Sequence, residues 1–317
     1  MHFEIFHLTR FEYSNSVTES VMELRMQPLS NENQICTSYS LKLSPSARVF
    51  EFVDQFGNIV QHFDIPEKHT KLEITTKSFV EVNEPPKLPE SLPLESWKQL
   101  DEEIEKGDFW EFLLPSQFAH PTQSLTDLQK ELNATREKDP LTLLREINSF
   151  FKANFAYAPE TTEVDSPIDV AIKQRSGVCQ DFANIMIALV RGLKIPCRYV
   201  SGYLFHRTDD RSHIAQDATH AWVEAYLPTL GWVGFDPTND LIVGDRHISV
   251  AVGRDYNDVP PTKGVFKGNV ESQLSVAVRV RQAETDEIES SELHAVKRKG
   301  FTVTMKPKVQ EAAQQQQ

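Results

Sequence analysis

The 317-residue chain contains few cysteines and no long apolar run. Cys36, Cys179 and Cys197 form an odd, widely spaced set, which argues against a disulfide framework and for a reducing compartment. The sequence has no CxxC pair and no HExxH motif, so neither a structural zinc site nor a zincin site is supported. It also lacks a run of about eighteen apolar residues, so we expect no membrane span.

Basic residues are scarce relative to acidic ones. Lys and Arg number 33 against 46 Asp and Glu, which gives a formal net charge of −13. Such a chain is a poor candidate for binding nucleic acid through phosphates, so we expect no nucleic-acid partner. The first residues, MHFEIFHLTRFEY, lack the features of a signal peptide. Together with the sparse cysteines, this predicts a cytoplasmic protein.

The first part of the chain alternates apolar and polar residues, the period of half-buried strands. The stretches that do so are FEIFHLTRFEYS, SYSLKLSP, RVFEFVDQFGNIVQHFDI and KLEITTKSFVEV. Short strands at this spacing predict an all-β N-terminal domain over residues 1–84, built as a sandwich or barrel. Four prolines within residues 85–93 then begin a linker and helical connection that we place at residues 85–124.

Residues 125–262 mix helical and strand patterns and are expected to form the core of a second domain. Asp139 and Pro140 can cap and open one helix, and apolar spacing predicts another from Cys179 to about Leu193. The stretches CRYVSGYLF, THAWVEAYL and GWVGFD are predicted strands. Residues 263–283 hold a late strand, and residues 284–317 have the composition of a disordered tail.

Cys179 has a special position at the first turn of its predicted helix. Backbone N–H groups there lack partners, and the helix dipole favours a thiolate over a thiol. Gly177, just before it, is expected to supply torsions that a side chain would forbid. On this ground alone, a nucleophile and a structural cysteine are equally good interpretations.

A second segment adds a base and a carboxylate. On a strand, His220 and Trp222 share one face. A hairpin centred on Pro228 would pair residue 220 with residue 236, which makes His220 and Asp236 direct cross-strand neighbours. Asp236 could then accept the imidazole N–H and leave the other ring nitrogen for the thiol proton of Cys179.

Plainer interpretations exist for these and other residues. Cys179, His220 and Asp236 could ligate zinc, but a catalytic triad explains the same three residues better. Trp222 and Trp232 could wall an acyl-binding groove, although aromatic packing explains them equally well. The remaining histidines and cysteines that we weighed are expected to be solvated, packed or incidental: Cys36, Cys197, His2, His7, His62, His69, His120, His206 and His213.

The segments RSGVCQDFANIMIALVRGLKIPCRYVSGYL and THAWVEAYLPTLGWVGFDPTND strongly resemble the transglutaminase-like superfamily, in its bacterial branch of candidate cysteine proteases. The resemblance covers about residues 135–245, and the N-terminal β segment resembles the domain that precedes the core in that branch. It implies an α+β fold, with a papain-like transglutaminase core in which the cysteine helix packs on an antiparallel sheet, preceded by the all-β domain. It further implies Cys179 as nucleophile, His220 as general base and acid, and Asp236 as orienting carboxylate.

The expected activity is acyl transfer or hydrolysis of an amide on a protein or peptide substrate, through a thioester. Hydrolysis by a protease or amidase is slightly preferred to transglutaminase crosslinking, by family analogy alone. No D-x-D-x-D-G stretch is present, so a calcium loop is not expected, and we expect neither cofactor nor metal. The alternative is a non-catalytic binding or assembly module that reuses the fold.

Overall fold

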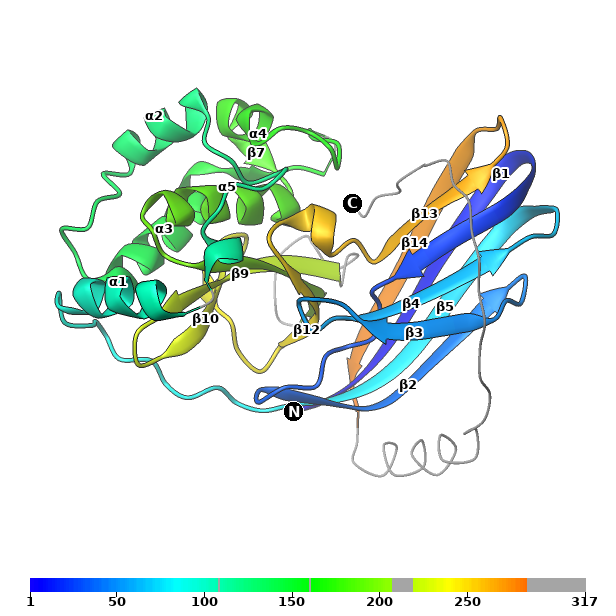
Figure 1. The fold of residues 1–317 in the computed structure, drawn as a ribbon, viewed down its shortest axis with the longest axis horizontal. Coiled ribbons are helices and arrows are strands. Elements are labelled where there is room, and N and C mark those ends of the chain that lie inside the picture. The colour runs from blue at the N-terminus through cyan, green and yellow to red at the C-terminus, as the bar shows by residue number, and fades with distance from the viewer. Residues whose placement is uncertain (108, 160, 207–218, 284–317) are drawn as a thin grey trace.

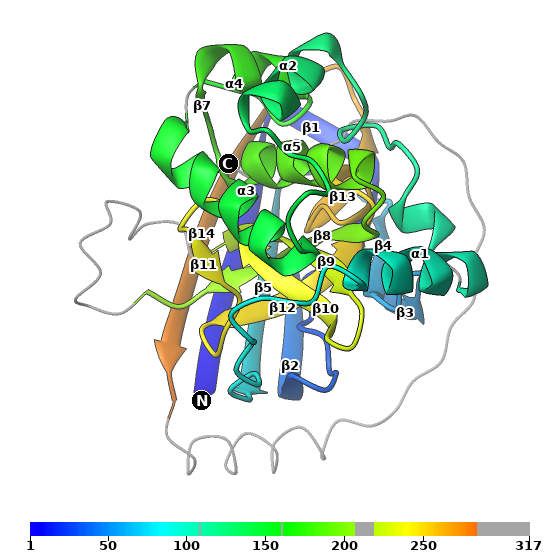
Figure 2. The same ribbon diagram turned by 90° about the vertical axis from the view of Figure 1, so that its left-hand side faces the viewer.

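The computed structural model describes residues 1–107, 109–159, 161–206 and 219–283. Two parts lie side by side: helices packed on the sheet of the core, and a second, all-β sheet (Figures 1 and 2). This is the α+β architecture predicted from the sequence. Among the described helices, none has the length and apolarity that crossing a membrane requires. The predicted tail at residues 284–317 and the predicted loop residue His213 lie outside the described residues.

The N-terminal sheet has seven strands, five of them in the order β2-β5-β1-β4-β3. Two further strands, β13 and β14, both pair with β1. The predicted strands of residues 1–84 are all present in it. The bounds are β1 His2–Leu24, β2 Gln34–Ser44, β3 Val49–Val53, β4 Ile59–Ile65, β5 His69–Val82, β13 Thr262–Lys267 and β14 Ser272–Gln282.

Strand β1 organises this sheet because its two halves have different partners. Its first half lies between β5 and β14, whereas its second half lies between β4 and β13. The last described strand therefore returns to the first one (Figure 1). The late strand predicted within residues 263–283 is β14, and together with β13 it completes the N-terminal sheet.

The N-terminal sheet curls around a core of its own. Phe11, Phe63 and Leu72, from β1, β4 and β5, are fully buried in one apolar cluster. Side chains from both edges, Leu41 of β2 and Leu274 of β14, pack against the same cluster. A flat sheet could not bring its opposite edges to one core, so the sheet is an open barrel, within the predicted choice of sandwich or barrel.

The second part contains a five-stranded antiparallel sheet in the order β11-β10-β9-β8-β12. Helices α3 and α5 pack on one of its faces, and α2 and α4 lie on the far side of α5 (Figure 2). The strands are β8 Cys197–Leu204, β9 Thr219–Leu227, β10 Gly231–Asp236, β11 Leu241–Ile242 and β12 His247–Gly253, with a short parallel pair, β6 Ala156–Tyr157 and β7 Ser176–Gly177. The helices are α1 Ser96–Lys106, η1 Trp110–Phe112, α2 Gln123–Glu131, α3 Pro140–Asn154, α4 Ile168–Gln174, α5 Cys179–Gly192 and η2 Tyr256–Asp258.

Helices α3 and α5 begin where the sequence predicted. Asp139 Oδ1 accepts hydrogen bonds from the backbone N–H groups of Leu141 and Thr142, both at 3.1 Å, and Pro140 takes the first helical position. Helix α5 begins at Cys179. It is buried on almost every side rather than along one stripe, because the sheet packs on one side of it and other helices on the rest (Figure 2).

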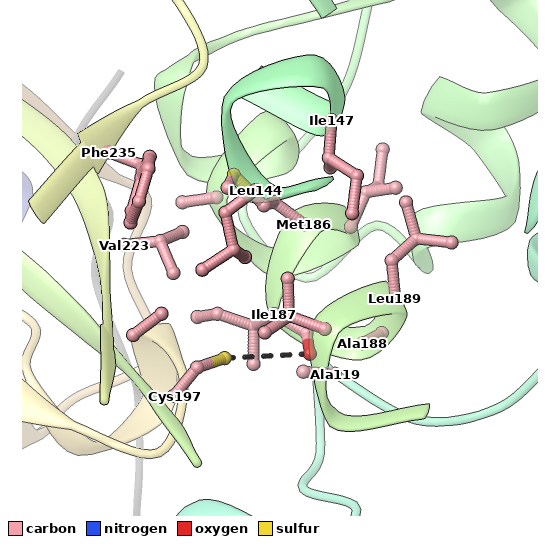
Figure 3. Close-up of a cluster of buried hydrophobic side chains, with 14 of the residues drawn as sticks. Ala119, Leu144, Ile147, Met186, Ile187, Ala188, Leu189, Cys197, Val223 and Phe235 are labelled. Carbon is pink, nitrogen blue, oxygen red and sulfur yellow. Dashed lines mark hydrogen bonds between the residues drawn. The ribbon is translucent and has the colours of Figure 1, made fainter. Parts of the chain in front are cut away.

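The core between α5 and the sheet is apolar and closely packed. Met186 and Ile187 of α5 face Val223 of β9 (Figure 3). Cys197 lies in the same cluster, with its thiol donating to the carbonyl oxygen of Ile187 at 3.6 Å. Burial raises the pKa of Cys197 to about 12. This cysteine is therefore a packing residue, as expected.

Arg191 ties the C-terminal end of α5 to its surroundings. Its guanidinium is buried and donates to the carbonyl oxygens of Phe112, Cys197 and Arg254 at 3.0, 3.0 and 2.6 Å. These acceptors lie on η1, β8 and the segment after β12. A buried arginine with this many acceptors fixes the orientation of the helix against the sheet. Because the helix is rigid, the anchor at its C-terminal end also helps to position its first residue, Cys179.

The two sheets meet in a shared apolar cluster. Phe3 and Ile5 of β1 pack there against Tyr203 of β8 and Ile248 of β12. His7, 1% exposed, lies beside this cluster, with Nδ1 2.9 Å from the Tyr203 hydroxyl. Burial lowers the pKa of His7 to about 3, so the ring between the two sheets is neutral.

This buried ring predicts a specific loss of stability in acid. The unfolded ring takes up a proton near pH 6.5 and the folded ring only near about pH 3, so acid favours unfolding between these values. Between pH 7 and about pH 4.5, wild type should lose about 2 to 3 kcal/mol more of its unfolding free energy than His7→Gln does. Urea unfolding at the two pH values measures this difference, and equal losses in the two proteins would contradict it.

Candidate active site

The site forms where α5 and β9 begin. Cys179 is the first residue of α5 and is partly exposed. The helix start is closed by Asp181, whose Oδ2 accepts from the backbone N–H of Val178 at 2.8 Å and from the Thr162 hydroxyl at 2.6 Å. Burial raises the pKa of Asp181. This cap holds Cys179 at the positive end of the helix dipole.

Gly177 is required here for space rather than for torsion. The prediction of backbone angles that a side chain would forbid is wrong, because Gly177 is not among the residues of positive φ. A Cβ atom at this position would lie 2.6 Å from the Asp181 carboxylate. The close approach of the capping residue therefore excludes a side chain at Gly177.

The predicted hairpin register is wrong by two residues. Residue 224 pairs with residue 234, and residue 226 pairs with Trp232, because the turn is centred on Thr229, one residue nearer the C-terminus than Pro228, and this moves each cross-strand partner by two residues. Since side chains alternate with a period of two, this shift leaves His220 and Asp236 on one face, as diagonal rather than direct neighbours. Nε2 of His220 lies 2.8 Å from Oδ2 of Asp236.

Asp236 is fully buried and has several donors. Its Oδ1 accepts from the backbone N–H groups of Thr238 and Asn239 at 3.1 and 3.2 Å. Its Oδ2 accepts from Asn239 Nδ2 at 2.8 Å and faces Nε2 of both His220 and His247, at 2.8 and 3.3 Å. Burial alone would raise the pKa of this carboxyl, but the two histidines outweigh burial and hold it well below its usual range.

His220 joins the carboxylate to the thiol. Burial by itself would lower the pKa of this ring, but the charge and hydrogen bond of Asp236, with a hydrogen bond to Cys179, raise it well above its ordinary value. Because Nε2 faces Asp236, Nδ1 is the nitrogen left for the thiol. The structure therefore brings together the three residues predicted from the sequence, with a charged imidazole between a carboxylate and a cysteine at neutral pH.

Two residues of this cluster were missed by the sequence analysis. Asn239 follows the GWVGFD strand by three positions and donates to Asp236. His247 begins β12, a strand that the sequence pattern did not single out. The alternation in HISVAVG would have predicted the strand, but no local motif links His247 to residues on other strands.

The ligand atoms of His220, Asp236 and His247 lie within 4.8 Å of one another, a spacing that a metal ion could use. The hydrogen bonds favour another interpretation. Nδ1 of His247 accepts from the Gly244 backbone N–H at 3.3 Å, so the ring proton is on Nε2 and points to Asp236. Both carboxylate oxygens already accept from backbone or amide donors. We therefore interpret the cluster as a network of hydrogen bonds.

The two tryptophans do not lie as the groove hypothesis requires. Trp222 is fully buried, and the centre of its ring lies 5.2 Å from the centre of the His247 ring. It therefore packs against a residue of the site and does not line a groove. Trp232 lies at the far end of the hairpin, opposite Tyr226, and Arg198 stacks on it at 4.1 Å. Aromatic packing, the plainer of our two interpretations, accounts for both residues.

Comparisons with known proteins show the family of this chain. Residues 127–237 match the family model of the transglutaminase-like superfamily, and residues 3–81 match that of the bacterial transglutaminase-like N-terminal region. An uncharacterized protein of Mycobacterium tuberculosis (strain ATCC 25618 / H37Rv) is 36% identical over 301 residues, which cover 90% of this chain and 94% of that protein.

Two further relatives have descriptions that mention an activity. The solved structure of a candidate cysteine protease from Cytophaga hutchinsonii has a TM-score of 0.69 at 25% identity and covers 90% of this chain and 92% of that one. A protein-glutamine gamma-glutamyltransferase of Pseudomonas aeruginosa is 30% identical over 151 residues, 45% of this chain and 22% of that protein. The first likeness covers nearly the whole of this chain, and the second covers less than half of it.

Gly202 of β8 offers a test of how tightly the site is built. It pairs with His220, and a Cβ atom there would lie 2.2 Å from the carbonyl oxygen of Ile248 and 2.6 Å from the Trp222 ring. Gly202→Ala should therefore lower the unfolding free energy by about 1 to 3 kcal/mol or more, measured by urea unfolding. The control Gly192→Ala, on α5 with no atom closer than 4.0 Å, should be neutral or stabilising by up to about 1 kcal/mol. A Gly202→Ala protein as stable as wild type would contradict this account.

Proposed function

The chain belongs to the transglutaminase-like superfamily, and on that premise we propose that it is an enzyme that cleaves or exchanges amide bonds through a cysteine thioester. Cys179 is the nucleophile, His220 the general acid and base, and Asp236 the orienting carboxylate. One observation carries the proposal: Nε2 of His220 lies 2.8 Å from Asp236, and the interactions of this ring with Asp236 and with Cys179 raise its pKa well above the ordinary value.

The resting state of this enzyme is an ion pair. The negative charge of Asp236 stabilises the charged ring of His220, and the charged ring stabilises the Cys179 thiolate. The start of α5 contributes in the same direction, because the helix dipole favours an anion there. The nucleophile is therefore charged before substrate binds.

Acylation then requires one proton from His220. The thiolate attacks the amide carbonyl carbon, the S–C bond forms, and negative charge develops on the carbonyl oxygen. The backbone N–H of Cys179, at the first turn of α5, is a donor for that oxygen. His220 protonates the departing nitrogen as the C–N bond breaks, which leaves a thioester and a neutral imidazole.

Deacylation reverses the role of His220. The neutral ring takes a proton from water or from an amine as that molecule attacks the thioester, and the thiolate leaves. We favour water, and hence a protease or amidase, because the likeness that spans nearly the whole chain is to a candidate cysteine protease. The shorter likeness to a glutamyltransferase favours amine transfer as the second candidate. Assays of new amino termini, of ammonia and of amine incorporation on peptide substrates distinguish these reactions.

A protein or peptide is the substrate class that we propose, and the chemistry above needs no cofactor. We also propose the cytoplasm as the compartment, since the three cysteines are sparse and all free and a thiolate nucleophile must stay reduced. The rival function, a binding or assembly module without catalysis, predicts a Cys179 thiol that is not activated. The experiment below separates the two functions without knowledge of the substrate.

The other two cysteines make an internal control for activation of Cys179. Burial raises the pKa of Cys36 to about 11 and that of Cys197 to about 12, so both should react slowly. At about pH 6, iodoacetamide should alkylate Cys179 at least about tenfold faster than Cys36. In His220→Gln, which keeps a polar side chain but cannot be charged, that advantage should disappear. Peptide mass spectrometry of timed samples gives all three rates in each protein.

Two results would count against catalysis. Cys179 could react no faster than Cys36 in wild type, or its rate could be indifferent to His220→Gln. Either outcome would mean that the ion pair is not assembled, and the binding-module function would then be the better proposal.

A further inference from the structure

A second histidine shares the carboxylate of the triad. His247 lies on β12, three strands away from Asp236 in the order β10-β9-β8-β12, yet Nε2 of His247 is 3.3 Å from Oδ2 of Asp236. The side chains meet over the face of the sheet, where Gly202 of β8 has no side chain between them. The contact therefore depends on four strands and not on a local motif.

The proton of His247 has a defined place. Its Nδ1 accepts from the backbone N–H of Gly244, which leaves Nε2 as the nitrogen that donates to Asp236. The ring is 4% exposed and packs edge to face against Trp222. The groups around it that carry or can carry charge are Asp236 of β10, His220 of β9 and Arg246, its neighbour in the chain. Burial lowers the pKa of His247 despite Asp236, so the ring is neutral.

One oxygen of Asp236 thus has three side-chain partners. His220 and Asn239 approach Oδ2 to 2.8 Å each, and His247 completes the set. Asn239 also holds Oδ1 through its backbone N–H at 3.2 Å. The carboxylate cannot rotate without breaking several hydrogen bonds. The donors from Asn239 are local to the turn, whereas His247 is the partner that restrains Asp236 from across the sheet.

We propose that His247 is a positioning residue of the triad, a neutral Nε2–H donor that holds the Asp236 oxygen against His220 and takes part of its negative charge. This inference deepens the proposed function, on which it rests. A donor that competes for the same oxygen weakens the attraction between Asp236 and the charged ring of His220. His247 thereby keeps His220 acidic enough to release its proton to the leaving nitrogen.

The variants His247→Phe and His247→Gln separate this role from simple packing. Phe keeps the ring against Trp222 but removes the donor, whereas the Gln amide nitrogen can replace Nε2. In His247→Phe, the alkaline limit of Cys179 alkylation by the anionic reagent iodoacetate, which the charged His220 ring attracts, should move upward by about one pH unit. His247→Gln should restore most of the wild-type profile. His7→Phe is the matched control, since it removes an equally buried histidine from outside the triad and should leave the limit unchanged.

A nuclear magnetic resonance measurement on the unmodified full-length chain tests the proposal if a variant fails to fold. Long-range ¹H–¹⁵N spectra should show His247 neutral, with its proton on Nε2, from about pH 5.5 to about pH 8.5. A ring protonated on Nδ1, or one that titrates near about pH 6.5, would overturn the proposal. So would a His247→Phe profile that coincides with wild type. If Cys179 is instead unreactive in wild type while the His247 tautomer is as stated, the proposed catalysis fails and the restraint on Asp236 remains.

Discussion

A single buried carboxylate, Asp236, is the constraint around which the site is built. It has no exposure to solvent, and an unpaired charge in such a position would be strongly destabilising. The fold satisfies it with donors from its own turn, from β9 and from β12. The charge that Asp236 needs nearby is carried by His220, and the partner that His220 can reach on its other side is Cys179.

The rest of the molecule holds the partners of Asp236 in place. Helix α5 delivers Cys179 with its thiol at the positive end of the dipole, and Arg191 anchors the other end of that helix to η1, β8 and the segment after β12. The N-terminal sheet supports β8 and β12 through the shared apolar cluster that includes Tyr203 and Ile248. Because β13 and β14 return to pair with β1, the two ends of the described chain are joined in the same support.

The sequence was sufficient for the features that depend on local pattern. Cys179 follows a glycine at the start of an apolar-periodic helix, and His220 and Asp236 lie on adjacent strands of one hairpin. The register prediction was wrong by two residues, but the period of two in a strand preserved the face, so the pair survived the error. The same alternation and the spacing of apolar residues predicted the strands of the N-terminal sheet and helices α3 and α5, whereas the α+β fold class came from the resemblance to the transglutaminase-like superfamily.

Features that depend on long-range packing were not accessible in this way. His247 reaches Asp236 from a strand three positions away in the sheet. The residues next to His247 in the sequence do not indicate this contact. Trp222 is buried in a cluster with Val200 and Val252, and the strand pattern alone could not distinguish this packing from a place in a substrate groove. The return of β14 to β1 required pairing between residues more than 250 positions apart, which composition and periodicity do not specify.

The central claim is that the charge of Asp236 maintains a thiolate on Cys179 through His220. The ultraviolet absorbance of the thiolate, taken as the difference between each protein and its Cys179→Ser counterpart, tests it in the full-length chain. The account predicts a thiolate in wild type at about pH 6 and its loss in Asp236→Asn, which keeps the shape of the side chain but not the charge. Equal thiolate absorbance in the two proteins, or none in wild type, would contradict it.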